Sequence, residues 1–284
     1  MSGLTFAYGT NGLSDHRLGE ALHLLAEHGY TGVALTLDHA HLDPLADDLA
    51  VRVRAVRREL EAHGLAVAVE TGGRFVLDPA RKHEPTLLHD AAGRDRRLAL
   101  LHTAIDVAAE LGSDVVHLWS GRTPAGTPSA LAWSRLVAGV ADLLTHAERS
   151  GVTLAVEPEP GMLLDRLAGF RRLRQELGEH PRLGLTYDLG HGVCLEDAPV
   201  ADGILAMADV LRHVQIEDMR RGVHEHLPFG EGELDLPAAL SALHDIDYRG
   251  LVAVELPRHG HTAHTMVPQA IAALRAADRE VARR

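Results

Sequence analysis

Acidic and amide side chains stand at the ends of short apolar stretches of this chain, where they could take part in chemistry. Glu70, Glu157, Asp188, Gln215 and Glu255 each lie at or near the end of a β-type run. A polar group at the end of a buried strand is costly unless it is paired. Carboxylates that share a pocket of low dielectric repel one another, and a divalent cation relieves this repulsion. The pattern therefore favours a metal site.

Two other interpretations of these carboxylates stay open at the level of the residues. Two of them could form an acid/base pair with a raised pKa, as in glycosidases, and any one could cap the N-terminus of a helix. Cys194 is the only cysteine, so a cluster of thiolate ligands is excluded. If a metal binds, histidine and carboxylate must hold it, and hard oxygen ligands favour Mn, Mg or Co.

The elements that must position these residues are read from hydrophobic periodicity. Short β-rich runs alternate with amphipathic stretches along all 284 residues, without a Pro/Gly/Ser-rich linker. The alternation predicts an α/β fold, a (β/α)8 TIM barrel formed by a single domain of residues 1–284. Strands are expected at residues 4–8, 32–37, 65–70, 114–119, 153–157, 183–188, 210–216 and 251–255.

Four of the five polar residues lie on the expected fifth to eighth strands, so closure of a barrel would gather them on one side of its C-terminal face. Alternate residues of a strand face the same way. The residues two positions before Glu157 and Glu255 are Ala155 and Ala253, so the layer beneath is expected to be mostly small and uncharged. We therefore expect the carboxylates to have few partners except one another.

Two long irregular segments are expected on the same face, at residues 71–93 and 217–234. The first holds Lys82, the only lysine of the chain. We interpret Lys82, together with Glu70, as a determinant for an anionic or polyhydroxylated substrate. The second segment holds His224 and His226, which are candidate pocket residues.

Other aromatic side chains are weaker indications of function. Trp119, at the end of the fourth expected strand, could form a wall against which a sugar stacks. His259, His261 and His264 follow the last expected strand in a spacing that resembles a metal site, but no carboxylate joins them. We interpret these three as ordinary loop histidines.

The composition limits the partners. The formal net charge of −12 argues against a nucleic-acid-binding surface. No apolar stretch reaches the roughly 18 residues of a membrane span, and residues 1–12 lack the features of a signal peptide. We therefore expect a cytoplasmic protein that acts on a small molecule, with a homo-oligomer as one possible state.

Five stretches in the C-terminal half resemble the xylose-isomerase-like TIM-barrel superfamily of sugar isomerases and epimerases. They read LAVEPEPG, GLTYDLGH, RHVQIED, FGEGELD and VAVELPRHG. Each stretch alone matches the superfamily only loosely, but their order and spacing together are specific to it. The resemblance implies one divalent ion, usually Mn, Mg or Co, held by Glu157, Asp188, Gln215 and Glu255.

The resemblance also implies residues that contact substrate. His191 is similar to the substrate-binding histidine of the family's D-x-x-H motif, and Arg221 matches the position of an arginine that grips the substrate in epimerases. Gln215 is a departure, because ketose 3-epimerases of the family usually have histidine there. Hydroxypyruvate-isomerase-like members have glutamine at that place.

The implied activity is an isomerase or epimerase of a small sugar, keto-acid or cyclitol. Such enzymes move a proton beside a carbonyl through an enediolate that the metal stabilises, and Glu157 with Glu255 would be the acid/base pair. An inosose-type dehydratase or a non-catalytic sugar-binding barrel are the alternatives. An endonuclease-IV-like nuclease would need more histidine ligands and a basic groove, which the net charge of −12 speaks against.

Overall fold

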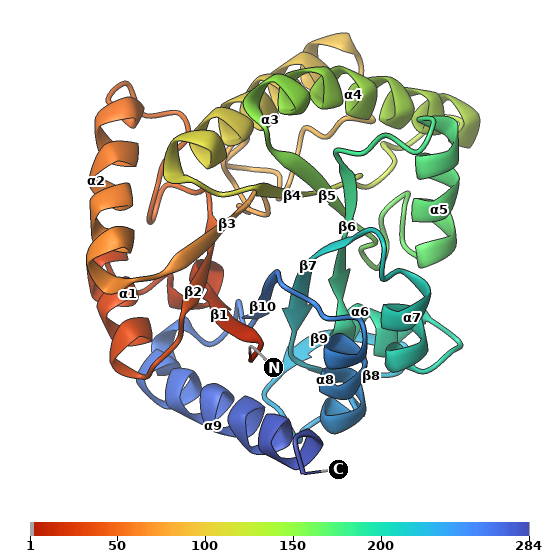
Figure 1. The fold of residues 1–284 in the computed structure, drawn as a ribbon. Helices are drawn as coiled ribbons and strands as arrows, with labels where there is room; N and C mark the ends of the chain where they lie inside the picture. The colour runs from red at the N-terminus through yellow and green to blue at the C-terminus, as the bar shows by residue number, and fades with distance from the viewer. Residues whose placement is uncertain (1–2, 284) are drawn as a thin grey trace.

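A computed structural model describes residues 3–283 and contains a closed barrel of parallel strands (Figure 1). The strand order around the barrel is β1-β10-β7-β6-β5-β4-β3-β2. This is the predicted (β/α)8 TIM barrel. The strands are β1 (Thr5–Gly9), β2 (Gly32–Thr36), β3 (Ala66–Glu70), β4 (Val115–Trp119), β5 (Thr153–Glu157), β6 (Leu183–Asp188), β7 (Leu211–Ile216) and β10 (Leu251–Val254).

Helices form a ring around the barrel, as Figure 1 shows. Short 3₁₀ turns, η1 (Thr10–Leu13) and η2 (Gly260–Thr262), follow β1 and β10. Among the described residues, no helix has the length and apolar character needed to cross a membrane. The helices are α1 (Leu18–Glu27), α2 (Leu49–His63), α3 (Ala91–Leu111), α4 (Ser129–Ser150), α5 (Leu167–Glu176), α6 (Leu189–Leu195), α7 (Val200–Ala206), α8 (Leu236–Asp245) and α9 (Ala263–Val281).

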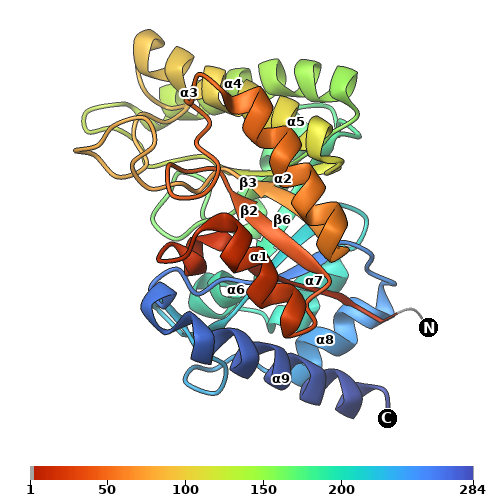
Figure 2. The same ribbon diagram turned by 90° about the vertical axis from the view of Figure 1, so that its left-hand side faces the viewer.

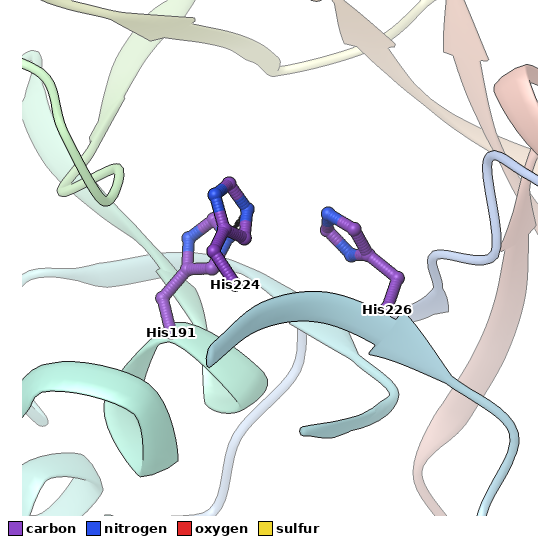
Figure 3. A group of neighbouring side chains, drawn as sticks. All are labelled: His191, His224 and His226. Atoms are coloured by element: carbon purple, nitrogen blue, oxygen red, sulfur yellow. Dashed lines mark hydrogen bonds between the residues drawn. The ribbon is translucent and has the colours of Figure 1, made fainter. Parts of the chain in front are cut away.

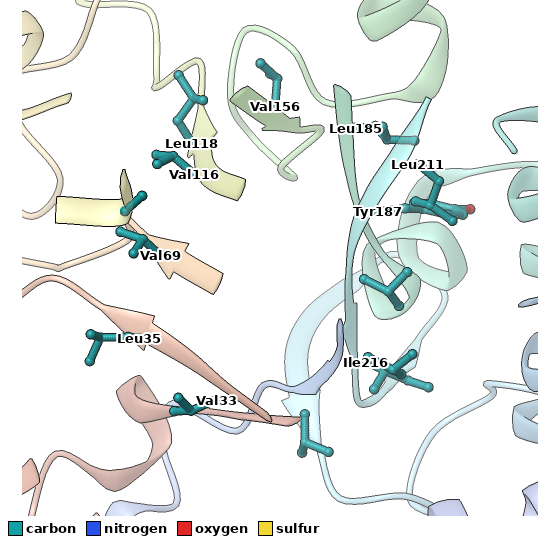
Figure 4. Close-up of a cluster of buried hydrophobic side chains, with 14 of the residues drawn as sticks. Val33, Leu35, Val69, Val116, Leu118, Val156, Leu185, Tyr187, Leu211 and Ile216 are labelled. Carbon is teal, nitrogen blue, oxygen red and sulfur yellow. The ribbon is translucent and has the colours of Figure 1, made fainter. Parts of the chain in front are cut away.

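The two faces of each strand have different side chains, as a period of two requires. Branched apolar residues such as Val33, Leu35 and Leu118 are buried in the large core between strands and helices (Figure 4). The alternate residues form a separate, smaller cluster inside the barrel, made of Ala7, Ala34, Ala68, Leu251 and Ala253. Because these are mostly small, the barrel interior leaves room for larger polar groups above them.

Several helices end at a glycine that leads into the next strand. Gly64 and Gly112, after α2 and α3, have φ angles of 64° and 78° in the left-handed region. Residues with a Cβ atom rarely adopt this conformation, so glycine ends the helix at low cost. The connection from each of these helices to the following strand is therefore short.

The segment 217–234 is more ordered than the sequence predicts. It contains the antiparallel ribbon β8 (Asp218–Arg220) and β9 (Val223–Leu227), joined by a tight turn in which Gly222 has a φ of 72°. The expectation of an irregular loop was wrong because the alternating pattern V-H-E-H-L after a glycine is a strand signal. The Asp218 carboxylate accepts hydrogen bonds from the backbone of Gly230 and Leu234, which holds the rest of the segment.

The other expected loop is irregular. Residues 71–90, between β3 and α3, form neither helix nor strand. Buried Arg97 of α3 donates hydrogen bonds to the carbonyls of His83 and Pro85, so the loop is anchored to the barrel wall. In the side view of Figure 2, loops project from the end of the barrel opposite the chain termini. That end is the C-terminal face of the strands, where sites in such barrels lie.

Candidate active site

A cavity of about 780 Å³ opens at the C-terminal ends of the barrel strands. Strand ends supply its floor, and the loop 71–90 and strand β9 supply much of its rim. Seven of the ten residues predicted as site residues line it: Glu70, Lys82, Trp119, Glu157, Gln215, His224 and Glu255. Of the other three, Asp188 and His191 are buried beside the cavity, and Arg221 is exposed on the turn between β8 and β9.

The four residues predicted as metal ligands lie on adjacent strands. Glu157 ends β5, Asp188 ends β6, Gln215 lies in β7 and Glu255 directly follows β10. Asp188 and Gln215 are partners in the register of the sheet. Because β5, β6, β7 and β10 are consecutive around the barrel, the four side chains occupy one side of its C-terminal face.

Glu157 is buried and held by two histidines. Its Oε2 lies 2.6 Å from Nε2 of His117, and its Oε1 lies 3.2 Å from Nδ1 of His191, an ion-pair distance without hydrogen-bond geometry. Burial alone would raise the pKa of Glu157, but the two histidines outweigh it and lower the pKa. The carboxylate is thus kept in its ionised form.

Glu70 positions the amide of Gln215. Its Oε1 accepts hydrogen bonds from Nε2 of His213 at 3.0 Å and from Nε2 of Gln215 at 2.9 Å. Thr36 donates to the other oxygen at 3.2 Å. With the amide nitrogen committed to Glu70, Oε1 of Gln215 is presented as a neutral oxygen donor.

The expectation that the carboxylates have few partners except one another was wrong. His117 and His213, in the layer below the strand ends, contact Glu157 and Glu70. Both histidines are buried at 2% and 0% relative exposure, so they face inward from β4 and β7. The layer below is otherwise small, as expected, with Ala68 as one example.

A second group of acids is crowded together on the same floor. Asp188, Glu217 and Glu255 lie close enough for one oxygen of each to share a site with a nitrogen of His226. Burial raises the pKa of Glu217 well above its ordinary range, and the negative charges of Asp188 and Glu255 raise it further. The pKa of Glu255 is raised for similar reasons, although Asn11 donates a hydrogen bond to it at 2.7 Å.

Asp188 also acts as a helix cap. Its Oδ1 accepts a hydrogen bond from the backbone N–H of His191 at 2.8 Å, at the start of α6. The capping role considered from sequence is therefore real for this residue. It occupies one oxygen of the carboxylate and leaves Oδ2 available.

The types of donor suit a divalent cation, and the predicted carboxylates fall in two neighbouring groups, with Asp188 and Glu255 in one and Glu157 in the other. Three buried oxygens, Glu157 Oε1, Asp188 Oδ2 and Gln215 Oε1, have no hydrogen-bond partner among residues 3–283. Buried polar atoms are normally satisfied, so three together indicate a missing partner. Three carboxylates and one amide are ligands that hard cations prefer.

Three histidines gather beside this floor (Figure 3). His191 comes from α6, and His224 with His226 from β9. The Nε2 atoms of His191 and His224 are 3.1 Å apart. Glu159 lies near, with its Oε1 3.8 Å from Nε2 of His224. Burial, reinforced by Glu157 and Asp188, raises the pKa of Glu159 to about 7.

The rim of the cavity carries four basic side chains beside the acidic Asp38 and Glu84. Arg74, Lys82, Arg122 and Arg258 all line it. Partial burial, then the charges of these arginines, lowers the pKa of Lys82, which means that the four cations lie within electrostatic reach of one another. Trp119 lines the same wall, with its ring centroid 5.0 Å from that of His83.

Arg221 is not brought to the cavity. Its guanidinium donates hydrogen bonds to the Glu196 carbonyl at 2.6 Å and to the Asp197 carboxylate at 2.9 Å, on the outer side of the ribbon. The family resemblance implied a substrate contact, but in the structure the contacts of this side chain are with Glu196 and Asp197. Arg258, after β10, takes a place on the rim instead.

The histidines after β10 do not form a metal site with one another within the described chain. His264 packs against His16 with ring centroids 5.2 Å apart. The expectation that all three lie in a loop was wrong, because His261 belongs to η2 and His264 to the first turn of α9.

Sequence reasoning missed several residues of the site. Glu217 lies two positions after Gln215, so a period of two already placed both on the inner face of the chain. His117 precedes Trp119 by two residues, so the sequence shows that both side chains face the same way. It does not show that His117 contacts Glu157. No feature of the sequence marked Asn11, in the turn after β1, as a residue of the site.

The fold and this arrangement of acidic strand ends define the class of protein. The chain belongs to the xylose isomerase-like TIM barrel family, whose sequence model matches residues 22–277. The resemblance read from the sequence is thereby confirmed.

Curated relatives of the chain include sugar epimerases. It is 26% identical to fructoselysine 3-epimerase from Shigella flexneri over 175 residues, which cover 60% of this chain and 62% of that protein. It is also 26% identical to L-ribulose-5-phosphate 3-epimerase from Escherichia coli over 239 residues, 84% of this chain and 81% of that protein. The chain thus spans less than two thirds of the first of these relatives.

Solved structures share the fold over nearly the whole chain. D-allulose 3-epimerase from Methylomonas sp., in complex with D-allulose, superposes with a TM-score of 0.74 at 18% identity, covering 98% of each chain. The apo form of 3-keto-D-glucoside 4-epimerase from E. coli gives 0.75 at 18% identity, covering 96% of this chain and 99% of that one.

Proposed function

We propose that this protein is a divalent-metal-dependent isomerase or epimerase of a small sugar, keto-acid or cyclitol. The observation that carries the proposal is the set of oxygen donors on four adjacent strand ends, three of which have a buried oxygen without a hydrogen-bond partner in the described chain. Sugar epimerase activity in the relatives supports the same class of reaction.

Glu157, Asp188, Gln215 and Glu255 would hold the ion. The Glu70 carboxylate contributes by orienting the Gln215 amide, and Mn, Mg or Co suits this oxygen-rich set. When bound, the ion supplies positive charge that stabilises the oxyanion developing on the substrate.

Glu157 and Glu255 are the proposed acid/base pair. They stand on β5 and just after β10, with β6 and β7 between them, so they approach a substrate in the cavity from different directions. One carboxylate removes the proton from the carbon beside the carbonyl, and the other returns a proton. Returning it to the opposite face of that carbon gives epimerisation, and returning it to the neighbouring carbon gives isomerisation.

Other side chains of this chain would bind and orient the substrate. His191 and His224 stand beside the floor, where their ring nitrogens can contact hydroxyl groups. Trp119 provides an apolar wall, and Lys82 on the rim is suited to an anionic group. Glu70 lines the cavity too, but its hydrogen bonds to Gln215 and His213 make positioning its main role.

The proposal is tested by isotope exchange. Protein loaded with Mn²⁺ is incubated in D₂O with a panel of ketoses, keto-acids and inososes, and deuterium at the carbon beside the carbonyl is measured by NMR and mass spectrometry. Glu255→Gln should slow exchange by about 10²- to 10⁴-fold, the usual contribution of a general acid or base. Glu231→Gln, a change at an exposed position that does not line the cavity, is the matched control.

Undiminished exchange in Glu255→Gln would remove this residue from the acid/base role. A product lighter by one water would instead identify a dehydratase. Wild-type protein that binds no divalent metal would contradict the proposal as a whole.

A further inference from the structure

Arg97 of α3 is a buried cation to which the proposed function gives no role. It is 4% exposed and does not line the cavity, but it contacts groups that form and support the cavity wall. We infer that Arg97 is a positioning residue for substrate recognition, which fixes the wall made by Trp119 and His83 and keeps Lys82 over the cavity. This inference rests on the proposed function and deepens it, because it concerns how the same cavity selects its substrate.

The guanidinium of Arg97 joins two separate parts of the chain. Its Nε donates a hydrogen bond to the Pro85 carbonyl at 2.8 Å, and its Nη2 donates one to the His83 carbonyl at 2.7 Å. Its Cζ lies 4.9 Å from the ring centroid of Trp119, a distance at which a cation attracts an aromatic face. One planar fork of donors therefore holds the loop 71–90 against the end of β4.

His83 and Trp119 also contact each other, and both line the cavity. Their ring centroids are 5.0 Å apart. Lys82 directly precedes His83, so a fixed backbone at His83 also fixes the point from which the Lys82 side chain extends. Lys82 lines the same cavity. Arg97 thus supports an aromatic wall and a basic group of the rim together, without contacting substrate itself.

The middle of the loop 71–90 depends on this anchor. The loop contains neither helix nor strand. Two other arginines hold it, Arg74 and Arg96, but their hydrogen bonds are exposed to solvent. The bond from Arg97 to the Pro85 carbonyl is buried, where water competes less and a hydrogen bond is electrostatically stronger. Removal of Arg97 should therefore loosen this part of the cavity wall.

The burial of Arg97 is costly, which argues for a role beyond packing. Burial lowers the pKa of Arg97 to about 10, and no ion pair with a carboxylate offsets this cost among residues 3–283. Replacing a buried charge by an apolar side chain of similar volume is often neutral or stabilising. Departures of this kind from the most stable choice are expected at functional sites.

The chain offers a matched pair for comparison. Arg172 lies over Trp133 with its Cζ 3.9 Å from the ring centroid, so the type of contact is the same. The Arg172 side chain is 59% exposed and pairs with Glu176, and none of these three residues lines the cavity. Arg172→Met therefore removes an arginine from a tryptophan face without changing the cavity wall.

The first test is a double-mutant cycle of Arg97→Met and Lys82→Met, measured as KM for a keto-acid of the exchange panel. Each single change should raise KM about tenfold, the effect of losing a hydrogen bond between charged groups. If Arg97 acts by placing Lys82, the double variant should be no worse than Arg97→Met alone. kcat should stay within about twofold of wild type, since binding is what is lost. Arg172→Met should leave KM unchanged.

Arg97→Lys separates geometry from charge. Lysine keeps the positive charge but lacks the planar fork that holds both carbonyls. KM in Arg97→Lys should therefore resemble KM in Arg97→Met. A wild-type KM in Arg97→Lys would overturn positioning by the guanidinium.

The second test does not depend on activity. Hydrogen–deuterium exchange of the full-length protein, followed by mass spectrometry, should show backbone amides of residues 71–90 exchanging about tenfold faster in Arg97→Met, because lost hydrogen bonds lower the free energy of local opening. Arg172→Met should exchange like wild type in this loop. An unchanged far-UV circular dichroism spectrum reports that Arg97→Met is folded, and Arg97→Lys takes its place in both tests if it is not.

The outcomes separate this inference from the proposed function. Effects of Arg97→Met and Lys82→Met on KM that multiply, or unchanged exchange of the loop in Arg97→Met, would overturn the inference and leave the proposed function intact. Metal-loaded wild type that exchanges deuterium into no substrate of the panel would contradict the proposed function, and the loop measurement would still decide whether Arg97 holds the wall.

Discussion

The floor and the rim of the cavity have opposite character. The floor is acidic and consists of side chains at the ends of strands, whereas the rim carries Arg74, Lys82, Arg122 and Arg258 on loops. Floor residues are fixed by the register of the barrel and by buried hydrogen bonds. Rim residues depend on loop conformation and face solvent. The floor is thus suited to metal binding and proton transfer, and the rim to recognition of a negatively charged part of the substrate.

Of the substitutions that test this comparison, one at the buried floor is expected to have the largest effect. His117→Phe removes the partner at 2.6 Å from Glu157 and leaves its buried carboxylate with the longer contact to His191 alone. Breaking one side of a buried ion pair costs about 3–5 kcal/mol. Urea unfolding in the presence of a chelator should show this loss of the free energy of unfolding.

A matched control for that prediction is His102→Phe. His102 contacts Asp142 at 2.9 Å, but both side chains are partly exposed, at 35% and 53%. Such pairs contribute about 1 kcal/mol or less. Equal losses of unfolding free energy in the two variants would mean that burial at the floor does not strengthen the contact between His117 and Glu157.

The next effect concerns the hydrogen bond between the Gln215 amide and Glu70. Glu70→Gln weakens the acceptor that directs the Gln215 nitrogen inward, so the amide can turn and withdraw its oxygen. Changes behind a metal ligand typically weaken metal binding by about 10- to 100-fold. Calorimetric titration with Mn²⁺ measures this, with Glu231→Gln as the unchanged control. Wild-type affinity in Glu70→Gln would contradict the positioning role.

A smaller effect is expected at the rim. Lys82→Met should raise KM about tenfold for substrates with a phosphate or carboxylate, because a hydrogen bond between charged groups contributes about 1.5–3 kcal/mol. kcat should stay close to wild type, since Lys82 lies away from the acidic floor. Neutral sugars should be unaffected, and Arg171→Met on the exposed side of α5 should change neither substrate class. An equal change for neutral and anionic sugars would remove Lys82 from charge recognition.

The smallest effect is expected at Arg221. Its contacts with Glu196 and Asp197 lie outside the cavity, so Arg221→Ala should change KM by less than about twofold. Steady-state kinetics with the best substrate of the exchange panel decides this. A tenfold rise in KM would support the substrate contact that the family resemblance implied.

The floor was more predictable from sequence than the rim. Glu157, Asp188 and Glu255 end apolar runs, and the order of those runs in the chain is also their order around the barrel. The ribbon β8–β9 was not predicted, because its strands of 3 and 5 residues are short and its pairing depends on one turn. The family resemblance placed Arg221 at the substrate, whereas in the structure its guanidinium contacts Glu196 and Asp197.

Partners of the floor residues could not be predicted for a different reason. His117 and Glu157 are 40 residues apart, and His213 and Glu70 are 143 apart. Periodicity shows that each side chain faces inward, but not which inward residues meet across the barrel. The same limit hid the histidine cluster, whose members come from α6 and β9.

The sequence by itself determined the alternation of strands and helices, the inner face of each strand and the acidic character of the strand ends. These properties follow from local periodicity and from the fixed order of a parallel barrel. Only the tertiary structure decided which groups neutralise, orient or crowd one another. Glu157 is paired with His117, whereas Glu217 is crowded by Asp188 and has no hydrogen-bond partner in the described chain. Electrostatic interactions depend on distances in space, and those distances are set by barrel closure and not by position along the chain.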